Sequence, residues 1–296
     1  MLDEESYDAY LQAGRIAREV KQIVLSGVRP NMDALSLCTL VEDEISRRGG
    51  RPAFPCNVDV DAVAAHYTPT HRDNFLLGDY SIVKVDFGVE VNGFIVDTAI
   101  SIPLNNQYAS LILATEEALR LAIKSIRAGV RVVEIGAVVH NTLTRHGFKP
   151  IRNLTGHEID RFLLHCGVSI PNVPTSSTSE LREGGVYAVE PFGTLQAAAG
   201  EVINSATVNI FQVSRNVSAR RLKDDELRLL ERLREISRGL PYTLRWIGYD
   251  NADVHSRLYK KGVVIGYPVL VERTGCPVAQ SEHTVIARYE GCEVLT

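Results

Sequence analysis

Hydrophobic positions near the start of the chain recur at the spacing of an α-helix. Val20 and Val24 continue an apolar face that begins near the N-terminus, and the pattern stops at Gly27. A second pattern of the same kind begins near Asp33, a residue suited to an N-cap, and ends at the glycine pair 49–50. The first fifty residues therefore predict two consecutive helices.

The pattern changes to that of β-strands between residues 81 and 102. Two runs rich in β-branched residues, 82–85 and 94–96, flank the dipeptide Asn92-Gly93. Asn-Gly favours a two-residue turn because both positions tolerate the left-handed backbone that such a turn requires. We expect an antiparallel hairpin here.

This arrangement recurs about one hundred residues later in the chain. Helix candidates cover 108–127 and 133–146, and the tripeptide Gly-Val-Arg ends the first helix of each set, at 27–29 and 129–131. A repeated set of helices and strands is the sequence signature of a duplicated structural unit. The sequence predicts an α+β fold with internal pseudo-twofold symmetry.

One segment has no counterpart in the repeat. Residues 213–271 contain a charged helix candidate at 224–238, followed by polar and aromatic residues. We expect a helical insertion subdomain over 213–271 within one domain formed by 1–212 and 272–296. Its charged helix is typical of a solvated surface and does not by itself indicate a partner.

The composition is that of an ordinary globular protein, with 45% hydrophobic and 23% charged residues among 296. A formal net charge of −4 argues against a nucleic-acid-binding module, which would be basic. No apolar run approaches the length of a membrane span, and the five cysteines form no CxxC pair. We therefore expect a cytoplasmic protein with free thiols that binds neither membranes nor, by itself, nucleic acid.

Acidic residues interrupt otherwise apolar strand segments at Asp86, Asp97, Glu190 and Glu282. Asp86 and Glu190 occupy equivalent places in the repeat, each followed shortly by Phe-Gly. A single such residue is more often a rim residue or half of an ion pair than a metal ligand. Four in matching contexts reverse that order, because buried carboxylates are rare unless they are paired or bind metal.

The predicted hairpin brings two of these carboxylates together. A two-residue turn at 92–93 places Asp97 opposite Gly88 and makes Asp86 its diagonal neighbour, roughly 7–8 Å away at the backbone. Like charges at that distance repel unless a cation lies between them. With His157, four carboxylates and one imidazole suit a hard or borderline divalent metal, and bridging carboxylates suit two ions.

The remaining histidines carry weaker signals. His66 lies in a turn of small residues before the hairpin, and His165 follows His157 by eight residues, an even spacing that puts both on one face if the segment is a single extended strand. Either one alone is more often a structural histidine than a catalyst. The others are expected in polar or helical surface segments without a role: His71, His140, His146 and His255.

Six short motifs contain these residues and together resemble one family. They are Ala-His-Tyr-Thr-Pro at 65–69, Val-Asp-Phe-Gly at 85–88, Val-Asp at 96–97, Asn-Leu-Thr-Gly-His at 153–157, Ala-Val-Glu-Pro-Phe-Gly at 188–193 and Gln-Ser-Glu-His-Thr at 280–284. Their order, together with the late insertion, resembles type 2 methionine aminopeptidase of the archaeal style over nearly the whole chain. The resemblance implies the pita-bread fold of the creatinases and aminopeptidases.

The resemblance also implies a site, residue by residue. The ligands of a dinuclear metal centre correspond to Asp86, Asp97, His157, Glu190 and Glu282. Two histidines that contact the substrate correspond to His66 and His165, and the walls of a methionine pocket to Phe54 and Leu164, with Tyr267 as a weaker pocket candidate. Eukaryotic members carry a further pocket histidine, whereas this chain has none between Glu190 and His255.

The implied activity is removal of the initiator methionine from nascent polypeptides whose second residue is small. Two divalent ions (Co, Mn, Fe, Ni or Zn) would convert a bridging water into a hydroxide that attacks the scissile carbonyl. Glu190 would move the proton to the leaving amine, His165 would stabilise the oxyanion, and His66 would bond the scissile amide. A free α-amino group is required, a monomer is expected, and a transient ribosome contact stays open.

Two alternatives remain at this stage. A prolidase or aminopeptidase P shares the fold and similar ligands, but it recognises proline after the scissile bond and normally carries an extra N-terminal domain. This sequence leads from Met1 straight into the first predicted helix and has the type 2 insertion. A non-catalytic, ribosome-associated relative would have broken ligation, whereas all five ligand positions are kept here.

Overall fold

The computed structural model describes residues 2–78, 81–215 and 222–296. Its helices are α1 (Glu4–Gly27), α2 (Ala34–Arg47), α3 (Ala109–Ser125), α4 (Val132–Arg145), α5 (Asp224–Ser237), α6 (Leu244–Ile247) and α7 (Ala252–Lys260), with 3-10 turns η1 (Asn106–Tyr108) and η3 (Tyr249–Asn251). The predicted helices at the start of each repeat are confirmed, with ends within a few residues of the expected ones.

The strands form two larger and two smaller sheets. The first larger sheet contains β1 (Arg51–Pro52), β4 (Ile82–Val91), β2 (Asn57–Val60) and β5 (Phe94–Pro103), and the second contains β15 (Gly291–Val294), β14 (His283–Arg288), β9 (Val186–Val189), β7 (Thr155–Asp160) and β8 (Leu163–Pro171). The smaller sheets are β13 (Val278–Gln280), β10 (Phe192–Leu195) and β6 (Phe148–Pro150), and β11 (Val202–Val213), β12 (Val264–Glu272) and β3 (Val63–Ala65).

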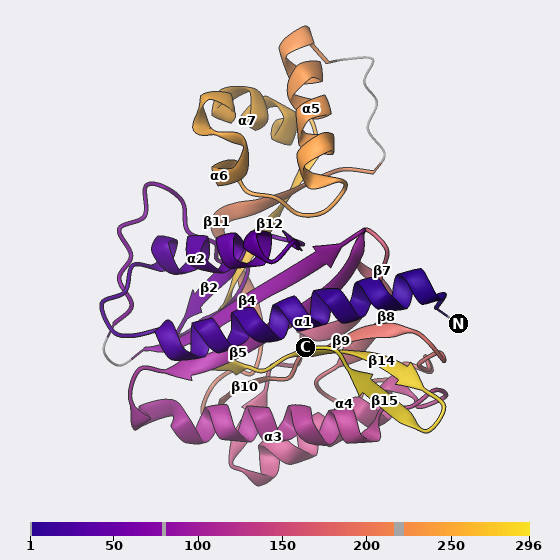
Figure 1. Ribbon diagram of the computed structural model, residues 1–296. Helices are drawn as coiled ribbons and strands as arrows, with labels where there is room; N and C mark the ends of the chain where they lie inside the picture. The colour runs from indigo at the N-terminus through magenta and orange to yellow at the C-terminus, as the bar shows by residue number, and fades with distance from the viewer. Residues whose placement is uncertain (1, 79–80, 216–221) are drawn as a thin grey trace.

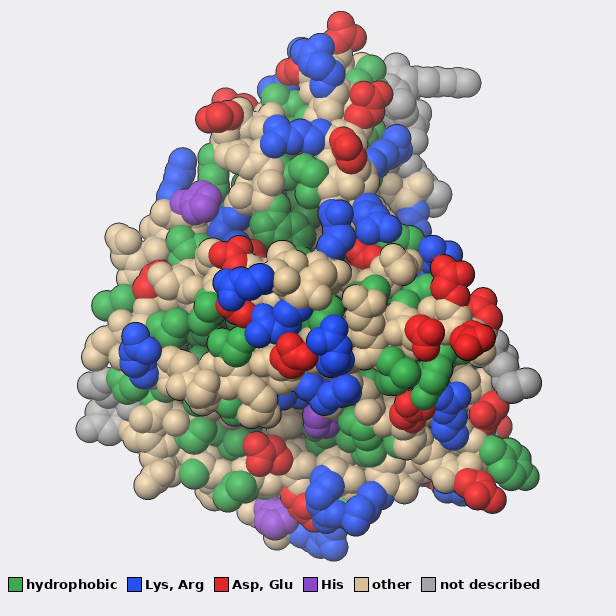
Figure 2. All heavy atoms as spheres, viewed as in Figure 1, with side chains coloured by type: hydrophobic (Ala, Val, Ile, Leu, Met, Phe, Trp, Pro, Cys, Tyr) green, Lys and Arg blue, Asp and Glu red, His purple; other side chains and the backbone are tan. Residues whose placement is uncertain are grey.

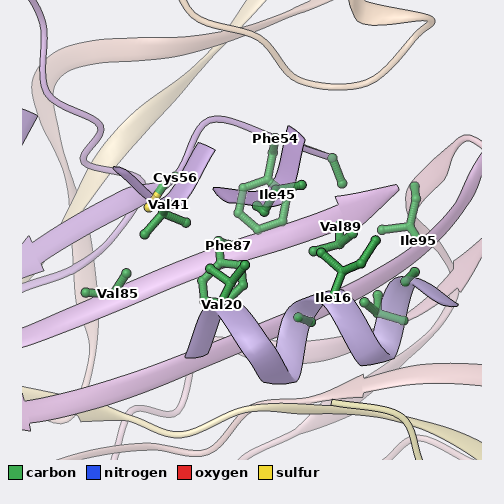
Figure 3. Close-up of a cluster of buried hydrophobic side chains, with 14 of the residues drawn as sticks. Ile16, Val20, Val41, Ile45, Phe54, Cys56, Val85, Phe87, Val89 and Ile95 are labelled. Atoms are coloured by element: carbon green, nitrogen blue, oxygen red, sulfur yellow. The ribbon is translucent and has the colours of Figure 1, made fainter. Parts of the chain in front are cut away.

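The first half of the molecule packs α1 and α2 against the sheet that contains β4 and β5 (Figure 1). The helix α1 begins at Asp3, whose carboxylate accepts a hydrogen bond from the Ser6 amide at 2.8 Å, as an N-cap does. Its apolar face, including Ile16 and Val20, lies over Phe87 of β4 in a fully buried cluster (Figure 3). This packing supports the β4–β5 hairpin through contacts of α1 with both strands.

The hairpin has the predicted turn and register. Asn92 has φ 53° and Gly93 φ 91°, so both turn residues are left-handed. Gly88 is paired with Asp97, which leaves Asp86 as the diagonal neighbour of Asp97. The sequence argument for bringing these two carboxylates together is confirmed.

The second half repeats this construction with α3 and α4, which cover the sheet of β9 and β14 and enclose a separate core (Figure 1). One difference separates the matching strands. The strand β4 runs unbroken through Asp86, whereas the chain leaves β9 at Val189 and enters β10 at Phe192. Pro191 has no amide hydrogen for a ladder, so Glu190 lies in a gap between two strands.

The segment between β11 and β12 rises from the rest of the molecule and carries α5, α6 and α7 (Figure 1). It has its own buried cluster, which includes Leu230, Leu233 and Leu258. The surface position expected for His255 is wrong: it is 3% exposed, and its Nε2 lies 2.9 Å from the Tyr242 hydroxyl. Its ring packs against Phe211 of β11, with 4.6 Å between the ring centroids. The limits proposed at 213 and 271 stay a prediction.

The distribution of surface charge and the state of the cysteines are as the net charge and the cysteine spacing predict. Acidic and basic side chains alternate over the face drawn in Figure 2 without a large patch of one sign. All five cysteines are free, as predicted. Among the described residues, no helix is both long enough and apolar enough to span a membrane.

Candidate metal centre

The predicted ligands come from separate elements and meet in the interior. Asp86 lies on β4, Asp97 on β5 and His157 on β7, while Glu190 follows β9 and Glu282 precedes β14. Each is at most 8% exposed except Glu190, whose side chain is 12% exposed. The two halves of the fold thus both contribute to one buried group.

His157 lies close to two of the carboxylates without a hydrogen bond to either. His157 Nε2 lies 3.6 Å from Asp97 Oδ2 and 3.6 Å from Glu190 Oε1, which is beyond hydrogen-bonding distance. Ligand atoms of Asp97, His157 and Glu282 all lie within 4.8 Å of one another. These atoms are close enough to ligate a common cation.

Several oxygens of this group have no partner. Asp86 Oδ1, Asp97 Oδ1 and Glu282 Oε1 are buried and accept no hydrogen bond from any part of the chain that the structure describes. A buried carboxylate without a partner is strongly unfavourable, and such atoms call for an explanation. A divalent cation supplies it, since four carboxylates and one imidazole are the donor set that hard and borderline ions accept.

Burial sets the protonation of the metal-free group. It raises the pKa of Asp97 to about 7, and together with neighbouring carboxylates it raises the pKa values of Asp86, Glu190 and Glu282 well above the ordinary range. Burial also lowers the pKa of His157 to about 4, which keeps its imidazole neutral. Metal ligands must be deprotonated, so a cation bound here displaces protons held by the carboxylates.

A cavity of about 290 Å³ adjoins the centre, and both candidate histidines line it. The His165 ring lies 4.0 Å from that of His157, centroid to centroid. The segment is not the single extended strand on which the even-spacing argument depended, because the chain reverses at residues 161–162 between β7 and β8. The two rings meet across this hairpin, helped by a register shift beside His157.

Both histidines are neutral near pH 7. Burial is the main cause that lowers the pKa of His165 to about 3 and also lowers that of His66. His66 Nδ1 lies 3.2 Å from the carbonyl oxygen of Pro268. A carbonyl can only accept, so the proton of His66 is on Nδ1 and its Nε2 is free to accept a hydrogen bond.

The rest of the cavity is largely apolar, and the three predicted pocket residues belong to it. Phe54 is 6% and Leu164 8% exposed, and Tyr267 stands edge-on to His66 with 5.9 Å between ring centroids. Further wall residues that we did not predict are Phe192, Ile210, Pro241 and Leu270. Their apolar character is common to most core positions, so the sequence gives no signal that singles them out.

Gln280 is another residue of the centre that the sequence reasoning missed. Its amide nitrogen lies 3.4 Å from Asp86 Oδ2 and 3.4 Å from Glu190 Oε2. It therefore orients one oxygen of each of these carboxylates. A signal did exist, because Gln280 precedes Glu282 by two residues within one of the six motifs.

Known proteins are similar to this chain in sequence and in fold. Metallopeptidase family M24 matches residues 8–226. A methionine aminopeptidase from Methanothermobacter thermautotrophicus is 41% identical over 298 residues, covering 98% of each chain. One from Thermococcus onnurineus is 40% identical, covering 98% of this chain and 99% of the relative.

Solved structures agree at the level of the fold. A thermophilic Arx1 superposes with a TM-score of 0.84 at 17% identity, over 100% of this chain and 91% of its own. The methionine aminopeptidase of Thermotoga maritima gives 0.72 at 22% identity, over 100% and 98%. A prolidase from Pyrococcus furiosus gives 0.64 at 14% identity, and the match covers 99% of this chain but 64% of that one.

Proposed function

Because the chain belongs to metallopeptidase family M24 and to its archaeal-type methionine aminopeptidases, we propose that the buried carboxylate centre and its cavity form the active site. The protein is a metal-dependent hydrolase that removes N-terminal methionine, and it has the pita-bread α+β fold. The observation that carries the proposed site is the set of buried carboxylate oxygens without partners beside an apolar cavity.

The metal would be held by Asp86, Asp97, His157, Glu190 and Glu282. We infer two ions, because four carboxylates with two oxygens each and one imidazole offer more donor atoms than one ion takes, and carboxylates bridge readily. The donor set accepts Co, Mn, Fe, Ni or Zn and does not select among them. When bound, such ions lower the pKa of a water molecule and polarise the scissile carbonyl.

Glu190 is the residue we assign to proton transfer. Its carboxylate is the most exposed of the five ligands and faces the cavity. Gln280 holds its Oε2, which leaves Oε1 on the side of His157. From there a carboxylate can take the proton of the attacking water and deliver it to the departing amine.

The two histidines act on the peptide from different sides of the cavity. His165, neutral and beside His157, would donate a hydrogen bond to the oxygen on which negative charge develops. His66 donates its Nδ1 proton to the Pro268 carbonyl oxygen, so its Nε2 would accept a hydrogen bond from the N–H of the scissile amide. This hydrogen bond would orient the amide nitrogen as it becomes an amine.

The apolar wall accounts for the side chain that is removed. Phe54, Leu164 and Tyr267 line the cavity that adjoins the centre, and an unbranched thioether fits such an apolar surface. We infer a preference for a small second residue and a requirement for a free α-amino group. Nascent polypeptides are the expected substrates. We propose that the enzyme acts on them as a cytoplasmic monomer, in transient contact with the ribosome.

The test is hydrolysis of Met-Gly-type and Met-Pro-type peptides, with Xaa-Pro dipeptides and N-acetylated Met peptides as controls. We expect free methionine from the unblocked Met peptides only, and loss of this release on chelation and in Asp97→Ala. Activity confined to Xaa-Pro dipeptides would assign the site to the prolidase type. No turnover with any ion in a folded, metal-binding protein would contradict the catalytic assignment.

A further inference from the structure

The insertion contacts the body of the molecule through a buried ion pair between α6 and α2. Arg245 is 5% exposed at its side chain, and its Nη1 and Nη2 donate to the two oxygens of Glu42 at 3.0 and 2.9 Å. Trp246 Nε1 donates to the same carboxylate at 2.9 Å, as does the amide of Cys56 at 3.1 Å. Glu42 is thus fully bonded, and the guanidinium is held in one orientation.

The rest of the guanidinium reaches the loop that carries His66. Arg245 Nε donates to the carbonyl oxygen of Pro69 at 2.7 Å, and Nη2 donates to the Thr68 hydroxyl at 2.9 Å. Thr68 and Pro69 are two and three residues after His66 in the chain. One side chain of the insertion therefore ties the active-site loop to α2.

His66 needs such support because of its backbone. Its φ is 70°, in the left-handed region that residues with a side chain seldom adopt and that persists only where the surroundings enforce it. The loop is also bonded at its inner side, where the Tyr67 amide donates to Asp59 Oδ1 at 2.9 Å and Asn209 Nδ2 donates to the Thr68 carbonyl at 3.0 Å. Arg245 holds the same loop from the side of the insertion, through its hydrogen bonds to Thr68 and Pro69.

We propose that Arg245 is a positioning residue for His66, so that the insertion sets the geometry of the active site from outside the cavity. Among the described residues that line the cavity Arg245 does not appear, so it acts through the loop and not on the substrate. The functional consequence rests on the role proposed for His66, whereas the positioning itself does not.

The guanidinium is essential to this arrangement. Arginine presents its N–H groups in a fixed planar fork, and here that fork bonds Glu42, Thr68 and Pro69 at once. A lysine keeps the charge but can reach only part of this set. Methionine at position 245 would retain the volume and leave Glu42 buried without a cation, so a second substitution in Glu42 is needed to separate charge from positioning.

The experiment compares Arg245→Met, Arg245→Lys and the double variant Glu42→Gln/Arg245→Met with Arg238→Met as the matched control. Arg238 also reaches from the insertion to a buried carboxylate, with Nη1 3.1 Å from Glu90 Oε2, but the structure records no contact between it and the loop. For each variant, kcat and KM on a Met-Gly-type peptide, metal affinity by calorimetry and hydrogen exchange of the peptide 60–72 are measured.

We expect kcat to fall about tenfold or more in Arg245→Met and in the double variant, with partial recovery in Arg245→Lys, while KM and metal affinity change about twofold at most. Exchange at the Tyr67 and Thr68 amides should accelerate in these variants and not in Arg238→Met. In a His66→Ala background, Arg245→Met should cause no further loss of kcat, because both changes remove the same contribution.

Two results would overturn the proposal. Unchanged exchange in the loop of folded Arg245→Met or of the double variant would show that Arg245 does not position it. An equal loss of kcat in wild-type and His66→Ala backgrounds would show that Arg245 acts by another route. If the wild-type enzyme released no methionine, the proposed function would fail, and the exchange measurement would still decide the positioning.

Discussion

Asp97 has the most influence on the charge state of the centre. It lies between the two halves of the fold, and its negative charge is among the causes that raise the pKa values of Asp86, Glu190 and Glu282. Its own Oδ1 has no partner among the described residues. The same side chain is therefore unfavourable in the metal-free protein and is one that we propose holds the metal.

Asp97→Asn should weaken metal binding by about tenfold or more and reduce methionine release by about a hundredfold or more, because a neutral amide is a poorer ligand than a carboxylate. Calorimetric titration with Mn²⁺ and the peptide assay measure the two effects. Val96→Ile, a neighbouring change on the same strand, serves as a control for disturbance of β5. Metal affinity equal to wild type in Asp97→Asn would remove Asp97 from the ligand set.

The same substitution should stabilise the metal-free protein, increasingly so as pH rises from about 4 to about 7, above which the difference levels off. Burial raises the pKa of Asp97 to about 7, so folding favours its protonated form, and this stabilisation is lost as pH rises through 7. The substitution also removes one of the charges that raise the pKa values of Asp86, Glu190 and Glu282, which changes the difference in the same direction. We expect a difference in Tm of about 5 °C at pH 8, measured after chelation. A difference that shrinks with rising pH would contradict the assignment.

Elements position the pocket as well as the ligands. Gly88 lies opposite Asp97 on the hairpin, and a Cβ atom there would come within 2.6 Å of the Phe54 ring and 2.9 Å of the Ala53 side chain. The close approach of β4 to the segment before β2 therefore depends on glycine. This contact places the wall of the cavity relative to the metal centre.

Gly88→Ala should raise KM for Met-Gly-type peptides by about tenfold, because the displaced Phe54 ring occupies part of the pocket. Metal affinity should change by about twofold at most, since no ligand is altered. Gly27→Ala, where an added Cβ meets no atom within 4 Å, is the control glycine. An unchanged KM in Gly88→Ala would mean that Phe54 does not bound the methionine side chain.

Elements with local signals could be predicted from the sequence, and elements without them could not. The helix caps at Asp3 and Asp33 and the turn at 92–93 depend on residues that are neighbours in the sequence. The pattern therefore predicts α1, α2 and the β4–β5 hairpin. The turn between β7 and β8 uses Phe162 at φ 54°, an unusual residue for that conformation. Its ring packs beside Gly93, a tertiary contact that no local pattern announces.

The same distinction applies to the site. The ligands could be found because acidic residues stand out in apolar strands, as Asp86 and Glu190 do. Arg245 and Glu42 could not, since their pairing joins positions 203 residues apart and charged residues in helices are ordinary. The burial of His255 likewise depends on how α7 packs and not on its neighbours in sequence.

At the scale of the whole molecule, the centre joins two halves that each have a separate core. Asp86 and Asp97 belong to the first half, while His157, Glu190 and Glu282 come from later segments. A site in which one group of ions contacts all of these residues exists only in the folded state. Metal binding therefore adds directly to the free energy of unfolding.

Saturating metal should raise the Tm of the stripped wild-type protein by about 5 °C or more, because it binds the native state selectively. The rise should be reduced by at least half in Asp97→Asn. Differential scanning calorimetry with and without ion, at one pH, measures both. A Tm that does not respond to metal in the wild type would show that the two halves are not joined through a shared ion.

The most direct test of the account is a titration of the metal-stripped enzyme with one ion type, following bound metal and methionine release together. The account predicts that release appears with the bound metal, is complete at two ions per chain, and is absent at all concentrations in Asp97→Asn. Release that persists after complete stripping, or that matches wild type in Asp97→Asn, would contradict the assignment of this centre as the active site.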